Sequence, residues 1–232
     1  MGRWAEESAL CSVGAVTTPA VSIRDAVVLL GSFPALAGAD FTVQNGEIVL
    51  VQGANGAGKS TLLRLCAGLL PVTRGEARIL GHDVTSERDL VRSHVGYLGH
   101  TNGLYLDLTA AENLSFWGRA VGASPAEVSD AATRMGLTPR LLDTQVARMS
   151  SGQKRRTALA VMVIRRAALW LLDEPHTGLD AAGRNEIDSI LREAAASGAT
   201  VVVASHELER AGSLATRRVE VAGGIVVEVG TP

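Results

Sequence analysis

A glycine-rich stretch, VQGANGAGKST at residues 51–61, restricts the folds open to this chain more than any other feature. The β-branched run at residues 48–51 predicts a buried strand, and apolar residues at helical spacing over residues 59–70 predict a helix that ends before Pro71. Glycines allow the connection between them to turn tightly, so its backbone N–H groups point inward beside the positive end of the helix. The stretch therefore predicts an α/β fold with a binding site for phosphate groups.

The pattern Gly53-x4-Gly58-Lys59-Ser60 is typical of loops that hold a nucleoside triphosphate together with Mg²⁺. In such loops the lysine contacts the β- and γ-phosphates, and the hydroxyl that follows it ligates Mg²⁺. An ordinary glycine turn is the alternative, but it does not require a strand before it and a helix after it. The predicted nucleotide-binding residues of the loop are Gly53, Ala54, Asn55, Gly56, Ala57, Gly58, Lys59, Ser60 and Thr61.

A second motif follows an apolar run at residues 167–172 and consists of Asp173 and Glu174. A strand in this position would deliver Asp173 to the coordination shell of Mg²⁺, as a second metal ligand beside Ser60. Glu174 would then orient or deprotonate the water that attacks the nucleotide. An acidic pair can also end a strand by chance, but together with the phosphate loop it predicts hydrolysis.

The order of the predicted elements divides the chain into a core and an insert. Strand patterns recur towards both ends of the chain, whereas helical patterns dominate the middle. We therefore expect an α/β core built from about residues 21–99 and 165–232, with a helical subdomain at about residues 100–164. Residues 1–20 carry two acidic residues before a weak apolar stretch, which is a poor signal peptide, and we expect them to form a loose lead-in.

The composition removes several classes of protein. With 47% hydrophobic residues, the 232-residue chain can bury a core and is not a disordered protein. A net charge of −2 argues against a nucleic-acid binder held by bulk charge. The chain contains no apolar run of about 18 residues that would span a membrane. Cys11 and Cys66 match no metal or redox spacing, and we expect Cys66 to be a small buried thiol in a cytoplasmic protein.

A third motif, Met149-Ser150-Ser151-Gly152-Gln153, precedes the last predicted helix of the insert and allows two interpretations. The serines can serve only as a polar cap of that helix. Alternatively, small residues at the start of a helix expose backbone N–H groups that bind an anion. The sequence alone does not decide whether that anion would sit on this chain's own phosphate loop or on another chain's.

Taken together and in this order, the motifs resemble those of the nucleotide-binding subunits of ATP-binding-cassette (ABC) transporters. The resemblance extends over about residues 21–230 and therefore covers nearly the whole chain. In chain order, residues 53–61 are similar to the Walker A motif of that family, residues 149–153 to its signature motif, residues 169–174 to its Walker B motif, residues 177–180 to its D-loop, and Ser205-His206 to its switch histidine.

The resemblance implies a fold, an activity and partners. The fold is a P-loop NTPase (RecA-like) core with an inserted α-helical subdomain and an N-terminal antiparallel β part. The activity is hydrolysis of ATP, with Mg²⁺, coupled to transport at the cytoplasmic face of the membrane. The partners are an integral membrane permease and a second ATPase subunit, which a homodimer would supply, and no nucleic acid is involved.

The same resemblance implies roles for residues outside the phosphate loop. Two subunits would pack head to tail, so that residues 150–153 contact the γ-phosphate of ATP held by the partner. His206 would contact the γ-phosphate in the chain's own site and act in catalysis with Glu174. Asp180 would contact the partner chain near the nucleotide.

Three positions depart from the pattern of the family. Ser151 stands where the signature motif has its first glycine. His100 stands where most relatives carry a glutamine near Mg²⁺ and the permease, and it is either a ligand of that site or a neutral loop histidine. Leu29 and Leu30 stand where an aromatic ring usually stacks on adenine, and Phe33 is a nearby substitute.

These departures are similar to those of the haem exporter ATPases that serve cytochrome c maturation. The similarity includes Tyr97-Leu-Gly-His100, the run from Leu108 to Trp117 and the Arg155-Arg156 pair, whereas residues 175–180 are closer to the general exporter pattern. The alternatives are the ATPase of another exporter for drugs, lipids or peptides, a soluble ABC ATPase outside transport, and a module that binds nucleotide without hydrolysis.

Overall fold

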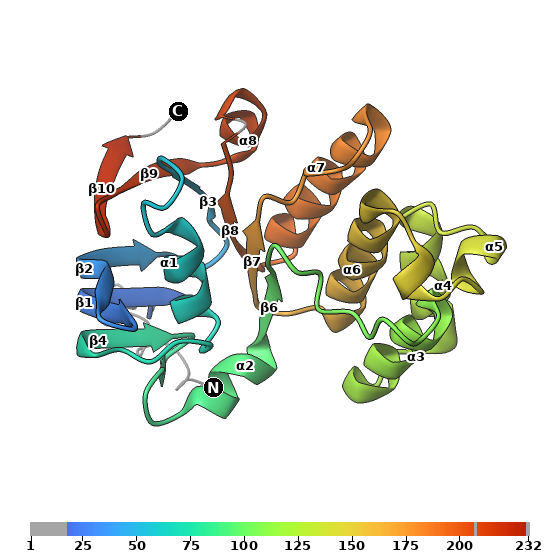
Figure 1. Cartoon of the computed structure of the whole chain (residues 1–232), viewed down its shortest axis with the longest axis horizontal. Coiled ribbons are helices and arrows are strands. Elements are labelled where there is room, and N and C mark those ends of the chain that lie inside the picture. The colour runs from blue at the N-terminus through green and yellow to red at the C-terminus, as the bar shows by residue number, and fades with distance from the viewer. Residues whose placement is uncertain (1–17, 207, 231–232) are drawn as a thin grey trace, which may run out of the picture.

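The computed structural model describes residues 18–206 and 208–230, in which a six-stranded sheet forms the centre (Figure 1). Its strand order is β10-β9-β3-β8-β7-β6. The inner strands are parallel, and only β10 runs antiparallel to its neighbour β9. The carboxyl ends of β3, β8 and β7 therefore meet at one edge. The strands are β3 (Ile48–Gln52), β6 (Val95–Leu98), β7 (Leu169–Asp173), β8 (Thr200–Ala204), β9 (Arg217–Ala222) and β10 (Ile225–Gly230).

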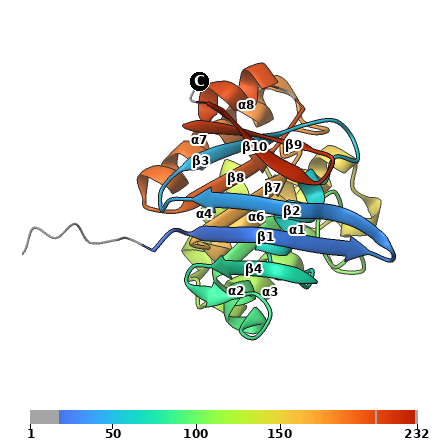
Figure 2. The ribbon, with the colours of Figure 1, turned by 90° about the vertical axis from the view of Figure 1, so that its left-hand side faces the viewer.

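A second, antiparallel sheet covers one side of the first, and its strand order is β2-β1-β4-β5 (Figure 2). Strands β1 and β2 alternate buried and exposed residues over much of their length, as a sheet with one buried face requires. This is the N-terminal antiparallel part that the family resemblance implies. Its strands are β1 (Val21–Leu30), β2 (Phe33–Val43), β4 (Arg74–Ile79) and β5 (His82–Asp83).

The helices occupy two regions of the molecule. Helix α1 contacts β7 and β8 of one sheet and β2 of the other, whereas α3 to α6 gather on one side (Figure 1). The predicted helical subdomain begins just after β6 and ends at the last turn of α6. No described helix is long and apolar enough to cross a membrane. The helices are α1 (Lys59–Cys66), α2 (Arg88–His94), α3 (Ala110–Val121), α4 (Pro125–Arg134), α5 (Pro139–Leu142), η1 (Val146–Arg148), α6 (Ser151–Arg165), α7 (Ala181–Ala196) and α8 (Leu208–Leu214).

Two hydrophobic clusters hold these layers together. The first lies between the two sheets around α1 and includes Val49 and Leu62. The second lies on the other face of the large sheet and packs α6 and α7 against β7 and β8 through residues such as Leu159, Leu172 and Leu191. Fully burying one such side chain contributes about 1.5–3 kcal/mol. The second cluster also joins the helices of the insert to the core.

Helix α1 is shorter than the sequence predicted, because it ends at Cys66 and does not continue to the residue before Pro71. Gly68 adopts a left-handed φ of 66°, its N–H donates to the Leu65 carbonyl, and the Leu69 N–H donates to the Arg64 carbonyl. These two hydrogen bonds form a Schellman motif, which terminates the helix. Burial raises the pKa of the Cys66 thiol to about 12, and the prediction of a buried thiol is confirmed.

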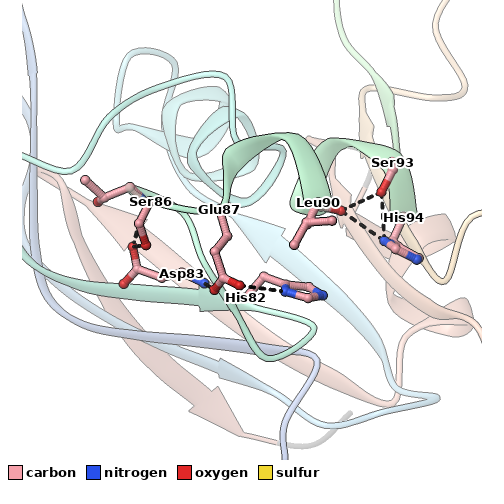
Figure 3. Close-up of polar contacts among 8 residues, drawn as sticks. His82, Asp83, Ser86, Glu87, Leu90, Ser93 and His94 are labelled. Atoms are coloured by element: carbon pink, nitrogen blue, oxygen red, sulfur yellow. Dashed lines mark hydrogen bonds and ion pairs between the residues drawn. The ribbon is translucent and has the colours of Figure 1, made fainter.

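The segment from β5 into α2 was not predicted as a helix, and local polar contacts stabilise it (Figure 3). The Glu87 carboxylate accepts a hydrogen bond from the Asp83 N–H at 2.9 Å and lies 3.4 Å from His82 Nδ1. The Asp83 carboxylate accepts from the Ser86 N–H at 3.0 Å, and such backbone hydrogen bonds lower the pKa of both carboxyl groups. The rings of His82 and His94 stack at 6.1 Å.

Residues 1–17 lie outside the described part of the chain, so the predicted lead-in and Cys11 receive no structural account. The predicted loops around Gly122 and Gly136 are confirmed as the connections between α3, α4 and α5. Helices α3 and α4 each begin with a capping box, formed by Thr109 with Glu112 and by Ser124 with Glu127. The P-loop NTPase fold with its antiparallel β part is confirmed by this arrangement.

Candidate functional site

The glycine-rich loop connects β3 to α1, and close contacts explain two of its glycines. Gly53 has a φ of 142°, and a Cβ atom there would lie 2.3 Å from the Val221 carbonyl oxygen. Gly58 has a φ of 115°, and its Cβ would lie 2.7 Å from the Ala35 carbonyl oxygen. Since side chains fit neither the space nor the backbone conformation, the loop depends on glycine at both positions.

Lys59 is the first residue of α1, and its side chain is nearly buried. The Lys59 ammonium donates to the carbonyl oxygens of Gly53 at 2.7 Å and Ala54 at 3.0 Å. Gly58 caps the helix without any side-chain hydrogen bond, and the first turn contains no acidic residue. The N-terminal N–H groups of α1 and the ammonium therefore form a positive end with no opposing carboxylate of its own turn, as an anion site requires.

A hollow of about 390 Å³ brings the phosphate loop together with the second motif. Asp173 ends β7 and Lys59 follows β3, and both strands are parallel to β8 between them, so their carboxyl ends meet in this hollow. Ligands in parallel α/β sheets commonly bind at this edge. The residues that line the hollow are Leu30, Phe33, Ala35, Asn55, Gly56, Gly58, Lys59, Ser60, Thr61, His100, Asp173 and Glu174.

The same hollow offers a donor set that fits Mg²⁺. Ser60 contributes a hydroxyl, and Asp173 contributes a carboxylate, which are the hard oxygen ligands that Mg²⁺ prefers. Among the described residues, no three His, Cys, Asp or Glu side chains gather as a metal site. Two protein oxygens suit Mg²⁺, which usually binds one or two of them together with phosphate and water. The nitrogen of His100 is a less suitable ligand, although the residue lines the hollow.

The predicted catalytic residues Glu174 and His206 lie together. The Glu174 carboxylate lies 2.9 Å from His206 Nδ1, and it accepts hydrogen bonds from the His206 N–H at 3.1 Å and the Ser205 hydroxyl at 3.3 Å. Glu174 has a left-handed φ of 51°, a conformation that costs a non-glycine residue roughly 1–3 kcal/mol. Strain of this kind persists only where surrounding contacts hold it, so the environment of Glu174 matters to its position.

Arg155 provides that environment, and the sequence analysis gave it no role of its own. Its guanidinium donates to the carbonyl oxygens of Asp173 and Glu174, both at 2.6 Å, and to those of Gly99 at 2.8 Å and Pro175 at 3.3 Å. The side chain is buried, and desolvation lowers its pKa to about 10 against the raising effect of the nearby carboxylates. Arg155 thus fixes the backbone on both sides of Glu174.

We expect Arg155→Lys to destabilise the protein by about 3 kcal/mol, because a single ammonium cannot satisfy four carbonyl groups around a buried charge. Urea unfolding would show this as a lower midpoint. Arg165→Lys is a matched control on the same helix, since Arg165 donates to the carbonyls of Arg92 at 3.4 Å and Val95 at 3.2 Å, away from the hollow. Equal midpoints for the two variants would contradict the assigned role of Arg155.

The signature-like motif lies at the start of α6. Ser150 caps this helix: its hydroxyl accepts from the Gln153 N–H at 3.2 Å, and its N–H donates to the Gln153 side chain at 2.9 Å. Ser150 therefore caps the helix, the anion-binding interpretation stays a prediction, and Ser151 and Gly152 form the exposed or half-buried first turn. A Cβ on Gly152 would lie 2.5 Å from the Gly178 carbonyl oxygen. None of these residues lines the hollow of the chain's own phosphate loop.

Asp180 caps α7 in the same neighbourhood. Its carboxylate accepts from the Gly183 N–H at 3.0 Å and from the Arg156 guanidinium at 2.6 Å. The backbone hydrogen bond from Gly183, followed by the charge of Arg156, lowers the pKa of Asp180. Arg156 belongs to α6, so this contact ties the start of α7 to the helix that carries the signature-like motif. Asp180 also lies outside the lining of the hollow.

Apolar side chains flank the phosphate loop on the side of the antiparallel sheet. Leu30 and Phe33 line the hollow and remain exposed at 44% and 66% of their surfaces. Leu29 is exposed as well but is not part of the lining. An aromatic ring exposed beside a phosphate loop can stack on a purine, so Phe33 as the substitute adenine contact stays a prediction that its position supports.

This fold and this site define a P-loop nucleotide-binding domain. Comparison with known proteins specifies the family, since residues 36–177 match the ABC transporter family. A relative from Bordetella bronchiseptica, the cytochrome c biogenesis ATP-binding export protein CcmA, is 44% identical over 169 residues, 72% of this chain and 75% of the relative. The CcmA protein of Nitrosococcus oceani is 41% identical over 167 residues, 72% of this chain and 76% of that relative.

Solved structures agree with this result. The structure of a bacterial Atm1-family ABC exporter with ATP bound has a TM-score of 0.83 at 27% identity, covering 94% of this chain and 39% of that one. The structure of an ATP-binding subunit of an ABC transporter has a TM-score of 0.78, covering 91% of this chain and 90% of that one. The chain belongs to the ABC transporter family and is an ATP-hydrolysing, nucleotide-binding subunit, as the motifs predicted.

Proposed function

We propose that this chain supplies the energy for an exporter that serves cytochrome c maturation, with haem as the cargo handled by its membrane partner. The observation that carries this proposal is the identity of 44% and 41% to proteins named for cytochrome c biogenesis and export. The stretch around His100 and the Arg155-Arg156 pair support the same subgroup. An ATPase for another kind of exporter is the second candidate, because the residues after Glu174 follow the general exporter pattern.

The functional unit is a dimer that binds two ATP molecules between its two chains. In each site Lys59 and the N–H groups of its loop bind the β- and γ-phosphates, and Phe33 contacts the adenine. Ser150 and the first turn of α6 contact the γ-phosphate held by the partner, which is supported by their position outside the chain's own hollow. Moving such a pair from 1% to 99% closed requires about 5.5 kcal/mol of differential binding, and charge-assisted contacts at two sites are of this order.

Hydrolysis uses residues at the ends of β7 and β8. Asp173 and Ser60 hold Mg²⁺, which, when bound, neutralises charge on the β- and γ-phosphates. Glu174 orients and deprotonates the attacking water, and His206 contacts the γ-phosphate. Loss of the γ-phosphate removes the contacts that only ATP makes, so the pair reopens. Asp180 links each chain to its partner near this site.

The proposed docking site of the permease is a groove between the core and the helices of the insert. The groove has a volume of about 460 Å³, and the Arg165 guanidinium lies over the Trp117 ring at 4.9 Å. The Tyr97 hydroxyl and the Trp117 indole N–H, which belong to residues of its lining, are buried without a hydrogen-bond partner among the described residues. A docked permease segment would cover the exposed Leu69 at the rim. Docked to the permease in this way, the chain would lie at the cytoplasmic face of the membrane.

A strain that lacks this gene tests the proposal. We expect it to lose haem-stained c-type cytochromes, and we expect the wild-type gene to restore them while a Glu174→Gln gene does not. Copurification of the tagged wild-type chain with an integral membrane protein would support the transport role. Normal cytochromes together with a changed tolerance to drugs would overturn haem export in favour of another exporter, and a chain that copurifies with no membrane protein would indicate a soluble ATPase.

A further inference from the structure

A polar chain of three side chains, two of them buried, connects the segments that follow Glu174 and His206. His176 Nε2 lies 2.8 Å from one carboxylate oxygen of Asp188, and the Arg210 guanidinium lies 2.6 Å from the other. His176 is 2% exposed and Asp188 is 6% exposed, so both are removed from water. These three side chains connect three segments of the protein: the turn after β7, helix α7 and helix α8.

The charge of Asp188 holds this arrangement together. Burial raises the pKa of Asp188, but the hydrogen bonds and charges of His176 and Arg210 outweigh burial and lower it overall. An ionised Asp188 accepts from both neighbours, so His176 Nε2 carries a proton and donates it. His176 Nδ1 is buried without a hydrogen-bond partner in the described structure, which means that this ring is held through Nε2 alone.

The two end residues of this polar chain lie close in sequence to the two catalytic residues. His176 follows Glu174 after a single proline, and Arg210 belongs to the helix that comes shortly after His206. Arg155 holds the backbone of Glu174 and Pro175 from the side of α6. The Asp188 carboxylate supports the same region from α7. It contacts both the turn after Glu174 and the helix after His206.

We propose that His176 is a positioning residue for ATP hydrolysis, which acts through Asp188 and Arg210 to fix the loop of His206 relative to Glu174. The proposal rests on the proposed roles of Glu174 and His206. Burying His176 and Asp188 costs desolvation energy, and well-packed apolar side chains would stabilise this region at least equally well. A directed polar chain, in contrast, sets one distance and one orientation between its segments. Small displacements of reacting groups have large effects on rate.

Three variants test this role in steady-state ATPase assays of the purified chain. His176→Gln keeps an N–H donor near the position of Nε2, whereas His176→Met keeps the volume and removes the donor. Arg134→Met is the matched control, because Arg134 also anchors α7, through Glu186 at 3.0 Å and Glu193 at 2.9 Å, on a face away from the hollow. We expect His176→Met to lower kcat about tenfold with an unchanged KM for Mg-ATP. His176→Gln should keep most of kcat, and Arg134→Met should change Tm but not kcat.

The outcomes separate this inference from the proposed function. A wild-type chain that hydrolyses no ATP contradicts the catalytic roles themselves. An active wild type with normal kcat in His176→Met, or with equally low kcat in His176→Met and His176→Gln, overturns the positioning role. If His176→Met does not fold, Arg210→Met breaks the same chain at its partly exposed end, and the same fall in kcat is expected there.

Discussion

Lys59→Ala is expected to weaken ATP binding by at least a hundredfold. The variant removes the ammonium that contacts the β- and γ-phosphates, and the loss of a charge-assisted contact in a partly buried site costs about 3 kcal/mol, where 1.4 kcal/mol corresponds to a factor of ten. The lysine is nearly buried, and its contacts with the carbonyls of Gly53 and Ala54 hold the ammonium at the loop. Titration calorimetry with Mg-ATP measures the effect.

Lys154→Ala is the control for this prediction, because the sequence contains no other lysine. Its ammonium contacts the Ala147 carbonyl at 3.4 Å at the start of α6, and Lys154 does not line the hollow. We expect the isolated Lys154→Ala chain to bind ATP as tightly as the wild type. An affinity of Lys59→Ala close to that of the wild type would contradict the phosphate-binding role of the loop.

Glu174→Gln is expected to bind ATP normally and to lower turnover by a factor of roughly 10²–10⁴, the range that a positioned general base contributes. The carboxamide has the shape of the carboxylate: its oxygen can still accept from the His206 N–H, and its NH2 group can donate to the Ser205 hydroxyl oxygen, so the loop should keep its position. It cannot take a proton from water. Because the γ-phosphate then persists, the variant should accumulate as a closed dimer.

Light scattering with saturating Mg-ATP checks this second prediction. The Glu174→Gln chain should roughly double its mass, while the same chain with ADP should remain monomeric. A variant that hydrolyses ATP at the wild-type rate would remove Glu174 from the role of base. A slow variant that stays monomeric with ATP, even beside its membrane partner, would instead contradict the shared clasp around the nucleotide.

The phosphate loop and Asp173 share one property: their positions follow from neighbours along the chain. The phosphate loop could be predicted because strand, glycines and helix are contiguous, and Asp173 because an apolar run delivers it. The end of α1 was missed because a glycine inside an apolar helical pattern does not by itself reveal a left-handed turn. Gly68 stops the helix through two backbone hydrogen bonds, which the periodicity of side chains does not report.

Arg155 and His176 were missed for a different reason. The partners of Arg155 are mostly backbone carbonyls on distant segments, and any residue type can supply a carbonyl. Asp188, the partner of His176, lies on the following helix, where a single acidic residue is unremarkable in sequence. Arg155 finds its partners only when folding brings α6 to the ends of β6 and β7, and His176 only when the turn after β7 meets α7. The roles assigned to Ser150 and Asp180 came from the family resemblance and remain predictions.

The contact between Gly152 and Gly178 has a consequence for engineering. A Cβ added at position 152 would lie only 2.5 Å from the Gly178 oxygen, so these two surface segments are in close contact and leave no space for a side chain. A mutation that retunes the first turn of α6 will also shift the turn before α7. The design of two unequal nucleotide sites therefore requires that both turns be changed together.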